Sequence, residues 1–366
     1  MNKQIVIVTI NDQMNYGNRL QNYALAKLLA RYGQVDTALC RTNLHSKFQQ
    51  ITLPLRSLAH EIITTAKEFS SGHYRIMRER RQNCARFTTT YVPDDTFTIT
   101  SMSGIVPKDR PIDTVVLGSD QIWNYRWLSE DALALRLGSF VGKNTRLISY
   151  AASFGVSEVE GNARQIFGQY LPQLSAISVR EDRGAELVKE LSDCAATVVL
   201  DPTLTMTDEE WKAITRGFIS DNDRYVLTYF LGRPNDVQEQ TIQAYAKQHN
   251  CRVRRLFDFR DKETYVAGPD DFVELFNKAQ YVFTDSYHAC CFSILFHRQF
   301  TVFNRAGMSG SSSMNSRMET LFRLFGLNAV VMDNGLAPSI DYEAVDQILK
   351  RHRVESQIWL DKAMES

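Results

Sequence analysis

The sequence predicts an α/β protein built from two Rossmann-like domains that face each other across a cleft. The chain has 366 residues, more than one domain usually holds. Short β-branched runs alternate with longer helical patterns, which is typical of parallel sheets built from βαβ units. A polar stretch over 201–223 divides this alternation into two series. We therefore expect a first domain over 1–205, a second over 222–340, and a C-terminal helix over 341–366 that packs back on the first domain.

Composition excludes several classes of protein. The chain is 44% hydrophobic and 23% charged, so disordered and fibrous proteins are excluded. Lys+Arg and Asp+Glu are both 42, which leaves no overall basic field for nucleic acid. No apolar run approaches the roughly 18 residues of a membrane-spanning helix, and the opening MNKQIVIVTINDQ is typical of a strand rather than a signal peptide. The six cysteines include no CxxC pair, which argues against a disulfide framework or a zinc site. We expect a soluble cytoplasmic protein with no metal or other cofactor.

The first series begins with an apolar strand over Ile5–Ile10, interrupted only by Thr9, as expected for a strand buried on both faces. A polar turn leads to a helix over Asn18–Tyr32, whose apolar residues recur at helical spacing. The stretch from 41 to 91 breaks the alternation and is interpreted as a helical insertion. The later strands of this domain are expected at Thr114–Leu117, Arg146–Ala151, Ala176–Val179 and Thr197–Leu200.

The second series ends in a predicted helix over Tyr342–Met364. Ligands of open α/β sheets bind just beyond the carboxyl ends of the strands, so the loops at those ends are the candidate sites. The strands of this domain are expected at Tyr225–Phe230, Arg252–Phe257, Tyr281–Thr284, Phe300–Asn304 and Ala329–Met332.

Two loops of the first domain carry polar side chains suited to a ligand. In NYGN, Asn18 is expected to cap a helix whose N-terminus either faces an anion or a sugar hydroxyl, or simply ends an ordinary turn. In GSDQIWN, Ser119 and Asp120 either contact a hydroxyl-rich ligand, cap a helix, or do both. Ser153, in SYAASFG, lies in a similar strand-end loop.

Two strand ends carry charged or titratable residues. Arg180 follows one strand and is suited to phosphate or carboxylate, the alternative being a local salt bridge with Glu181 or Asp182. His288, in TDSYHA, follows another strand and opens an apolar helix, and a histidine is the side chain best suited to move protons near neutral pH. The strand-end position favours a functional role over a structural one. The other six histidines lie away from strand ends and receive no role.

Two further groups of arginines have open interpretations. Arg305 and Arg317 flank a Gly/Ser-rich loop that either folds over an anionic ligand or is an ordinary surface loop. A basic run lies within the insertion, and its main interpretation is a solvated helix face. The alternative is contact with an anionic lipid surface or a diphosphate-linked acceptor. The run consists of Arg75, Arg78, Arg80, Arg81 and Arg86.

Taken together, these motifs resemble a known family. NYGNRLQNYAL, LGSDQIWN, SYAASFG, SVRED, TDSYHACCFSILF and SRMETLFRLFGL resemble, in this order, signature segments of the polysaccharide pyruvyl transferases. The matches extend from about residue 5 to 327. The resemblance implies a GT-B-like glycosyltransferase architecture. It also implies transfer of a pyruvyl group from phosphoenolpyruvate to a sugar of a cell-surface polysaccharide, such as an exopolysaccharide or capsule, or of its lipid-linked precursor, with formation of a cyclic ketal and release of phosphate.

The resemblance also implies roles for individual residues. His288 matches the family's histidine and is the expected acid, and Arg180 matches an arginine that holds the donor. The family's Arg-Leu-His reads Ser286-Tyr287-His288 here, so one cation is absent, and Arg305 or Arg317 is expected to replace it, with Arg305 favoured. The expected donor site, mainly on the second domain, comprises Arg180, Ser286, His288, Arg305 and Arg317. The expected acceptor contacts, on the first domain, are Tyr16, Asn18, Ser119, Asp120 and Ser153.

Two other functions remain open from the sequence. One is a GT-B glycosyltransferase that uses a nucleotide sugar, since a fold does not fix a function. The other is a non-catalytic subunit of a polysaccharide assembly complex. Peripheral association with the inner face of the membrane and the oligomeric state are likewise left open.

Overall fold

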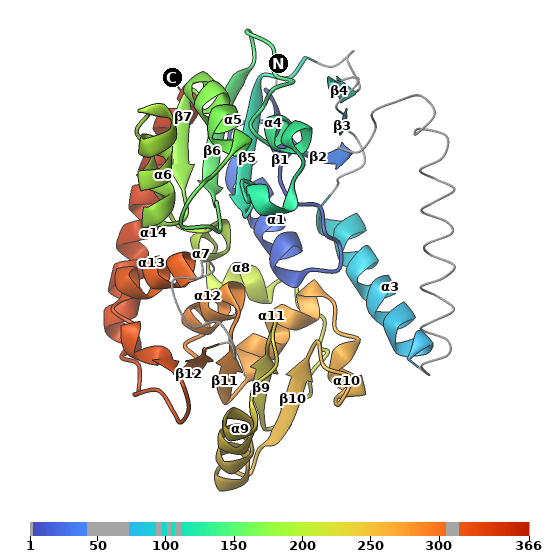
Figure 1. Ribbon diagram of the computed structural model, residues 1–366. Helices are drawn as coiled ribbons and strands as arrows, with labels where there is room; N and C mark the ends of the chain where they lie inside the picture. Colours follow the sequence, from blue (N-terminus) through green and yellow to red (C-terminus); the bar gives the residue numbers. More distant parts are fainter. Residues whose placement is uncertain are drawn as a thin grey trace.

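The computed structural model describes residues 3–41, 73–92, 97–100, 104–106, 111–304 and 315–365. They form two sheets flanked by helices, one sheet above the other in Figure 1. The eight-stranded sheet has the order β4-β3-β2-β1-β5-β6-β7-β8, and the five-stranded sheet has the order β10-β9-β11-β12-β13. Every neighbouring pair is parallel except β3 and β4, which run antiparallel. The predicted α/β class with two Rossmann-like domains is confirmed.

The first domain contains strands β1 (Gln4–Val8), β2 (Gln34–Arg41), β3 (Phe97–Thr100), β4 (Gly104–Val106), β5 (Thr114–Asp120), β6 (Arg146–Ala152), β7 (Ala176–Val179) and β8 (Thr197–Val198). Its helices are α1 (Tyr16–Leu29), α3 (Tyr74–Tyr91), α4 (Glu130–Arg136), α5 (Asn162–Tyr170) and α6 (Asp182–Ser192), with 3-10 turns η1 (Tyr125–Trp127) and η2 (Leu171–Gln173).

Helices α7 (Pro202–Thr205) and α8 (Asp208–Lys212) connect the two sheets. The second domain contains β9 (Tyr225–Tyr229), β10 (Arg252–Leu256), β11 (Tyr281–Thr284), β12 (Phe300–Phe303) and β13 (Val331–Met332). Its helices are α9 (Asp236–Gln248), α10 (Lys262–Tyr265), α11 (Pro269–Lys278), α12 (Tyr287–Leu295) and α13 (Asn315–Phe325), with the turn η3 (Asn328–Val330). The chain then enters α14 (Tyr342–Glu365).

Strand β1 illustrates why the core strands are apolar along their whole length. Successive side chains of a strand point to opposite faces. Ile5 and Ile7 pack in the cluster that contains residues of α1 and α14, whereas Val6 and Val8 pack in the cluster that contains residues of α4, α5 and α6. Both faces of the sheet are therefore covered by helices, as a parallel sheet requires.

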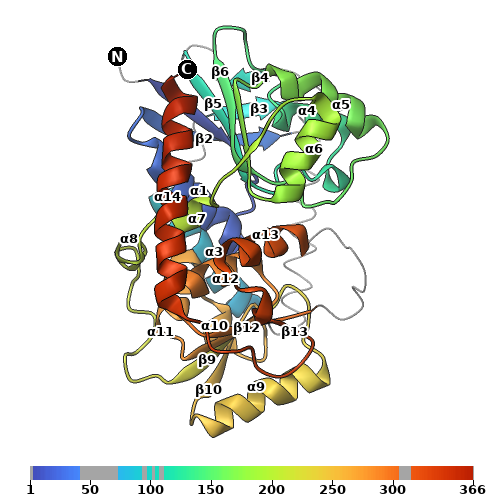
Figure 2. The ribbon, with the colours of Figure 1, turned by 90° about the vertical axis from the view of Figure 1, so that its left-hand side faces the viewer.

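Helix α14 joins the two domains. It runs alongside both of them in Figure 2 and ends beside the first sheet. Val345 and Leu349, near its beginning, pack in the core of the second domain, and Leu360 and Ala363, near its end, pack in a cluster with β1. Between these ends, Arg353 donates to the carbonyl oxygens of Leu204 and Met206 in the connecting segment, at 2.7 and 2.5 Å.

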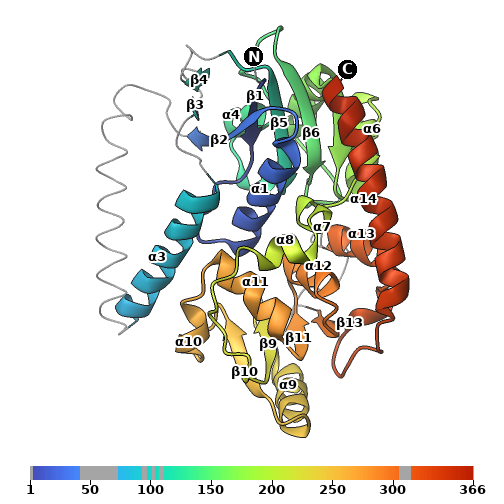
Figure 3. The same ribbon diagram turned by 180° about the vertical axis from the view of Figure 1, so that it is seen from behind.

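Helices α1 and α3 make the second connection between the domains, on the side seen in Figure 3. Tyr16 of α1 packs against Phe272 of α11, with ring centroids 5.1 Å apart, and Tyr23 packs against Trp211 of α8. On α3, Asn83 donates to the carbonyl of Val266 at 2.8 Å. Side chains of the first domain thus form part of the core of the second, and this shared core fixes the cleft between the sheets.

The stretch from 41 to 91 was predicted as a helical insertion. Its described residues form helix α3 at its end, β2 ends at Arg41 where the stretch begins, and β3 and β4, which were not predicted, follow it. Residues 42–72 lie outside the described residues. Among the described residues, no helix combines the length and the apolarity needed to cross a bilayer.

The basic run on α3 is not a uniformly solvated face. Arg80 is buried and donates to the Tyr16 hydroxyl at 3.2 Å and to the Met14 carbonyl at 2.7 Å. Arg86 forms an ion pair with Asp270 of α11. Arg75 and Arg78 are exposed, as predicted. The Arg80 guanidinium also lies over the rings of Phe257 and Tyr265 of the second domain. Both Arg80 and Arg86 therefore contact the second domain, which the sequence pattern did not indicate.

Replacing Leu360 tests whether α14 is an integral part of the first domain. Leu360 is fully buried, so Leu360→Ala should lower the free energy of unfolding by about 2–5 kcal/mol. Ile358 lies two residues away on the exposed side of α14, and Ile358→Ala should change the free energy of unfolding by less than about 0.5 kcal/mol. Urea unfolding of both variants measures the difference. Equal stabilities would show that the C-terminal half of α14 does not pack as described.

Candidate active site

A cavity of about 590 Å³ lies between the two sheets, within the range of small-molecule sites. The ends of β1 and β5 and the first turn of α1 line it from the first domain. The ends of β9, β11 and β12 and the helices α12 and α13 line it from the second domain. The cavity thus lies beyond the carboxyl ends of both sets of strands, where open α/β sheets bind ligands.

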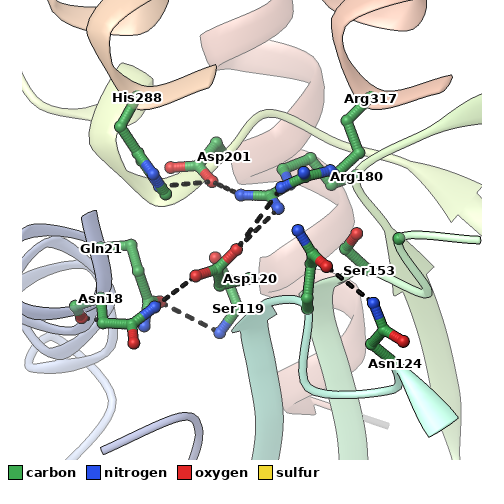
Figure 4. Close-up of polar contacts among 12 residues, drawn as sticks. Asn18, Gln21, Ser119, Asp120, Asn124, Ser153, Arg180, Asp201, His288 and Arg317 are labelled. Atoms are coloured by element: carbon green, nitrogen blue, oxygen red, sulfur yellow. Dashed lines mark hydrogen bonds and ion pairs between the residues drawn. The ribbon is translucent and has the colours of Figure 1, made fainter. Parts of the chain in front are cut away.

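A buried arginine lies behind the residues that line this cavity, and Figure 4 shows it bound to Asp120 and Asp201. Arg180 directly follows β7, and none of its side chain is exposed. Its Nη1 lies 2.6 Å from Asp201 Oδ2, and its Nη2 lies 2.9 Å from Asp120 Oδ1. The Tyr287 ring of α12 covers the guanidinium with its centroid 4.3 Å away. A planar guanidinium can bind two carboxylates at once, which a lysine ammonium at the same place cannot match in geometry.

Asp120 ends β5 and forms part of the cavity wall. One carboxylate oxygen binds Arg180, and the other accepts a hydrogen bond from Asn18 Nδ2 of α1. Burial alone would raise the pKa of Asp120, but Arg180, His288 and Arg317 outweigh it and lower the pKa to about 2. The carboxylate therefore stays ionised at neutral pH.

His288 lies in the first turn of α12 and lines the cavity. Its Nε2 lies 3.7 Å from Asp201 Oδ2, too far for a hydrogen bond, and has no other partner among the described residues. Burial lowers the pKa of His288, and the nearby Asp201 and Asp120 only partly oppose this effect.

Gly17 of α1 makes the position of His288 possible. A Cβ atom on residue 17 would lie only 2.1 Å from His288 Nδ1, so no other residue fits there without displacing the imidazole. Gly17 and His288 lie on opposite domains, and both line the cavity. This contact therefore sets how closely the two domains approach each other at the site.

Arg317 completes the charged cluster from the first turn of α13. Its Nη1 lies 3.8 Å from Asp120 Oδ1, and its Nη2 and Nη1 lie 2.6 and 2.8 Å from the Gln121 side chain when the amide oxygen faces them. Burial first, and then Arg180, lower the pKa of Arg317 to about 10, so it remains a cation at neutral pH. Among the described residues, its one ion pair is the distant one to Asp120, which leaves its charge largely available to a ligand.

The structure brings five of the predicted site residues to the cavity wall. They are Asn18, Asp120, Ser286, His288 and Arg317. Arg305 lies outside the described residues, as does most of the Gly/Ser-rich loop that follows it.

The other four predicted residues do not line the cavity. Tyr16 donates its hydroxyl to the carbonyl of Ala267 at 2.9 Å, within the core that joins the domains. Ser119 is fully buried, and its N–H donates to Gln21 Oε1 at 3.2 Å. Ser153 donates its hydroxyl to Glu181 Oε1 at 2.9 Å. Arg180 lies behind the residues that line the cavity, as described above.

Three local expectations were wrong. The cap of α1 is Asn15, whose side chain accepts from the N–H of Asn18 at 3.2 Å, so Asn18 itself lies inside the helix. Ser119 and Asp120 cap no helix, because both belong to β5. The acidic residues next to Arg180 do not form its ion pairs, which go instead to Asp120 and Asp201, 60 and 21 residues away.

Sequence reasoning also missed four residues of the site. Asp201 follows a predicted strand directly, so the strand-end rule could have found it. Gly17 belongs to the NYGN motif, which was selected as a candidate loop, but the residue that it contacts, His288, lies on the other domain. Trp127 and Arg136 line the cavity from η1 and α4, without any strand-end signal. Within the described ranges, no three His, Cys, Asp or Glu side chains come together in a way that could hold a metal ion.

Comparison with known proteins gives one strong match. The family model described as "Polysaccharide pyruvyl transferase" matches residues 15–307, which include every described residue of the charged cluster except Arg317. No curated protein matches the chain significantly.

The solved structures are only distantly similar. A putative UDP-N-acetylglucosamine 2-epimerase from Listeria monocytogenes is 11% identical with a TM-score of 0.46, covering 98% of this chain and 97% of the other. Arabidopsis thaliana UGT89C1, solved in complex with UDP-L-rhamnose, is 11% identical with a TM-score of 0.43, covering 100% of this chain and 94% of the other.

Adding one methyl group at residue 17 tests the contact between the domains. Alanine is a good helix former, so Gly17→Ala should act through the imidazole rather than the backbone. The displaced ring should lose part of its burial, and its pKa should rise from its lowered value toward 6.5. An NMR titration, with the His288 signal assigned from its absence in His288→Gln, measures this change. Gly142→Ala is the matched control, because a Cβ there meets no atom within 4 Å. An unchanged pKa in Gly17→Ala would contradict the geometry.

Proposed function

The chain belongs to the polysaccharide pyruvyl transferase family and is a transferase, and from this we propose which reaction it catalyses. It moves the pyruvyl group of phosphoenolpyruvate onto a sugar of a cell-surface polysaccharide or of its lipid-linked precursor, forms a cyclic ketal, and releases phosphate. The observation that carries the proposal is the cavity itself, where His288 and Arg317 of the second domain lie opposite Asn18 and Asp120 of the first.

The donor is assigned to the wall formed by the second domain. Phosphoenolpyruvate carries a phosphate and a carboxylate, so it needs cations and N–H donors in a partly dry site. Arg317 supplies a cation whose one ion pair with the described residues is the 3.8 Å contact to Asp120. Ser286 stands at the N-cap position of α12 without a capping hydrogen bond from its side chain, and the N-terminus of that helix adds a favourable field for an anion. Arg317 thereby replaces the cation that the family carries at the place of Ser286, while Arg305 remains a second candidate.

Arg180 acts in this proposal as a support rather than as a donor contact. Its guanidinium is already bound by two carboxylates and covered by Tyr287. It holds Asp120 in the cavity wall and Asp201 beside His288, and its charge adds to the positive potential at the donor site. This role differs from the direct contact that the family resemblance implies for the arginine of SVRED.

His288 is the proposed proton carrier. Binding of the anionic donor raises its pKa from the lowered value of the free protein, which puts a proton on the imidazole. His288 then protonates the methylene carbon, C2 becomes electrophilic, and a first sugar hydroxyl adds to C2 and returns its proton to the imidazole. A second hydroxyl displaces the phosphate. Of the two protons that the hydroxyls lose, one ends on the methyl group of the product and the other leaves with phosphate.

The acceptor is assigned to the wall formed by the first domain. Asp120 is ionised and accepts hydrogen bonds, and Asn18 provides an amide beside it. A carboxylate with a pKa of about 2 is a weak base, so its role is to orient the acceptor hydroxyl while His288 moves the protons.

His288→Gln tests the proposed chemistry. Wild-type protein, phosphoenolpyruvate and a panel of nitrophenyl and lipid-linked sugars should release phosphate, and the variant should turn over at least about 10²-fold more slowly, the range expected for loss of a general acid. His249→Gln, at an exposed position far from the cavity, should keep the wild-type rate. Release of UDP from UDP-sugars, with no phosphate released from phosphoenolpyruvate, would instead support the glycosyltransferase alternative.

Arg317→Ala tests the assignment of the donor cation. Hydrogen bonds to charged groups contribute about 1.5–3 kcal/mol, so phosphoenolpyruvate should bind roughly 10- to 100-fold more weakly. Arg323 lies on the same helix, where it pairs with Asp182 on the surface, and Arg323→Ala should bind like wild type. Calorimetric titration measures both. Unchanged binding in Arg317→Ala would remove it from the donor site.

A further inference from the structure

Trp127 and Arg136 line the cavity, and the proposed reaction assigns no role to either of them. Both belong to the segment that follows β5 in the first domain, Trp127 in η1 and Arg136 in the last turn of α4. A hydrogen bond of 3.2 Å from Trp123 Nε1 to the Arg136 carbonyl ties these two pieces together.

Arg136 is a largely buried cation without a counter-ion among the described residues. Its guanidinium forms no hydrogen bond or ion pair with the described part of the chain, and its Nε is buried without any partner. Burial first lowers its pKa, and Cys40 is the one group whose charge opposes this. An unpaired buried charge is costly. Binding of an anion from outside would remove that cost.

Trp127 presents a different chemistry in the wall of the same cavity. Its side chain is 63% exposed although it is large and mostly apolar. Hydrophobic surface at the mouth of a cavity commonly contacts a ligand, and an indole ring offers a flat face to the C–H side of a sugar ring.

The charged cluster around Arg180 lies apart from this pair. Arg136 lines the cavity from α4, whereas Asp120, His288 and Arg317 line it from β5, α12 and α13. The cavity therefore has a second cationic position, on the domain assigned to the acceptor.

We propose that Trp127 and Arg136 form the acceptor subsite, and that the acceptor is an anionic sugar whose ring stacks on Trp127 while its phosphate or carboxylate binds Arg136. Calling this sugar the acceptor rests on the proposed function. The binding of an anionic sugar at this place does not depend on any reaction. A sugar phosphate and a uronic acid offer the same chemistry to a guanidinium, and the two can be distinguished with separate ligands.

Calorimetric titrations without phosphoenolpyruvate test the subsite. For each of several hexoses, three ligands are compared: the methyl glycoside, the 1-phosphate and the corresponding uronic acid. Wild-type protein should bind one of the anionic forms of at least one hexose about tenfold or more tightly than the neutral form. Arg136→Gln should abolish this preference and leave the neutral form unaffected. Trp127→Ala should weaken the anionic and neutral forms alike.

Arg126→Gln is the matched control. Arg126 lies next to Trp127 and is exposed, but it does not line the cavity, so this variant should behave like wild type. Equal binding of neutral and anionic forms by wild type, or a preference that survives in Arg136→Gln, would overturn the proposal. Phosphate release from phosphoenolpyruvate in the presence of these sugars is measured separately. Its absence would reject the proposed reaction while leaving the Arg136-dependent binding intact.

Discussion

The buried guanidinium of Arg180, held between Asp120 and Asp201, is the interaction on which the rest of the site depends. These three groups lie at or just beyond the ends of β7, β5 and β8, so one side chain links the carboxyl ends of three strands within the run β5-β6-β7-β8. A buried charge is costly unless it is paired. Once Arg180 is present, both carboxylates must remain close to it, and they in turn set the electrostatic environment of His288 from one side and of Arg317 from the other.

The contact between the domains adds the second constraint. Tyr287 packs on Arg180 from the second domain, and Gly17 leaves room for His288 from the first. Tyr16 and Tyr23 of α1 pack against aromatic rings of α11 and α8, so the two sheets share one hydrophobic core at this place. The Ser286-Tyr287-His288 sequence differs at two positions from the Arg-Leu-His that the family resemblance implies, and the two differences have different consequences. The cation is lost at residue 286, and the ring gained at residue 287 contacts both Arg180 and Arg317.

The sequence was sufficient to predict features that depend on local order. Apolar strands such as β7 and β11 were placed with their observed bounds, and the strand-end rule selected Arg180 and His288 because it needs only the residues on either side. The sequence was not sufficient where the partner of a residue is distant in the chain. Asn15 and Asn18 are equally good helix caps by residue type, and only the path of the preceding chain decides between them. Nothing near Arg180 in the sequence indicates that its carboxylates stand 21 and 60 residues away, and nothing near Arg136 indicates that it pairs with no carboxylate of the described residues.

Arg180→Lys tests the central claim most directly, because lysine keeps the charge but cannot bind two carboxylates in the same way. If Arg180 supports the site from behind the cavity wall, one carboxylate loses its partner, and the free energy of unfolding should fall by about 1–3 kcal/mol. Because Asp120 and Asp201 would both shift, binding of phosphoenolpyruvate and of the acceptor sugar should weaken together. Unfolding and calorimetric titration of one protein preparation give all three values. Weaker phosphoenolpyruvate binding alone, with stability and acceptor binding unchanged, would contradict the account and make Arg180 a direct ligand of the donor.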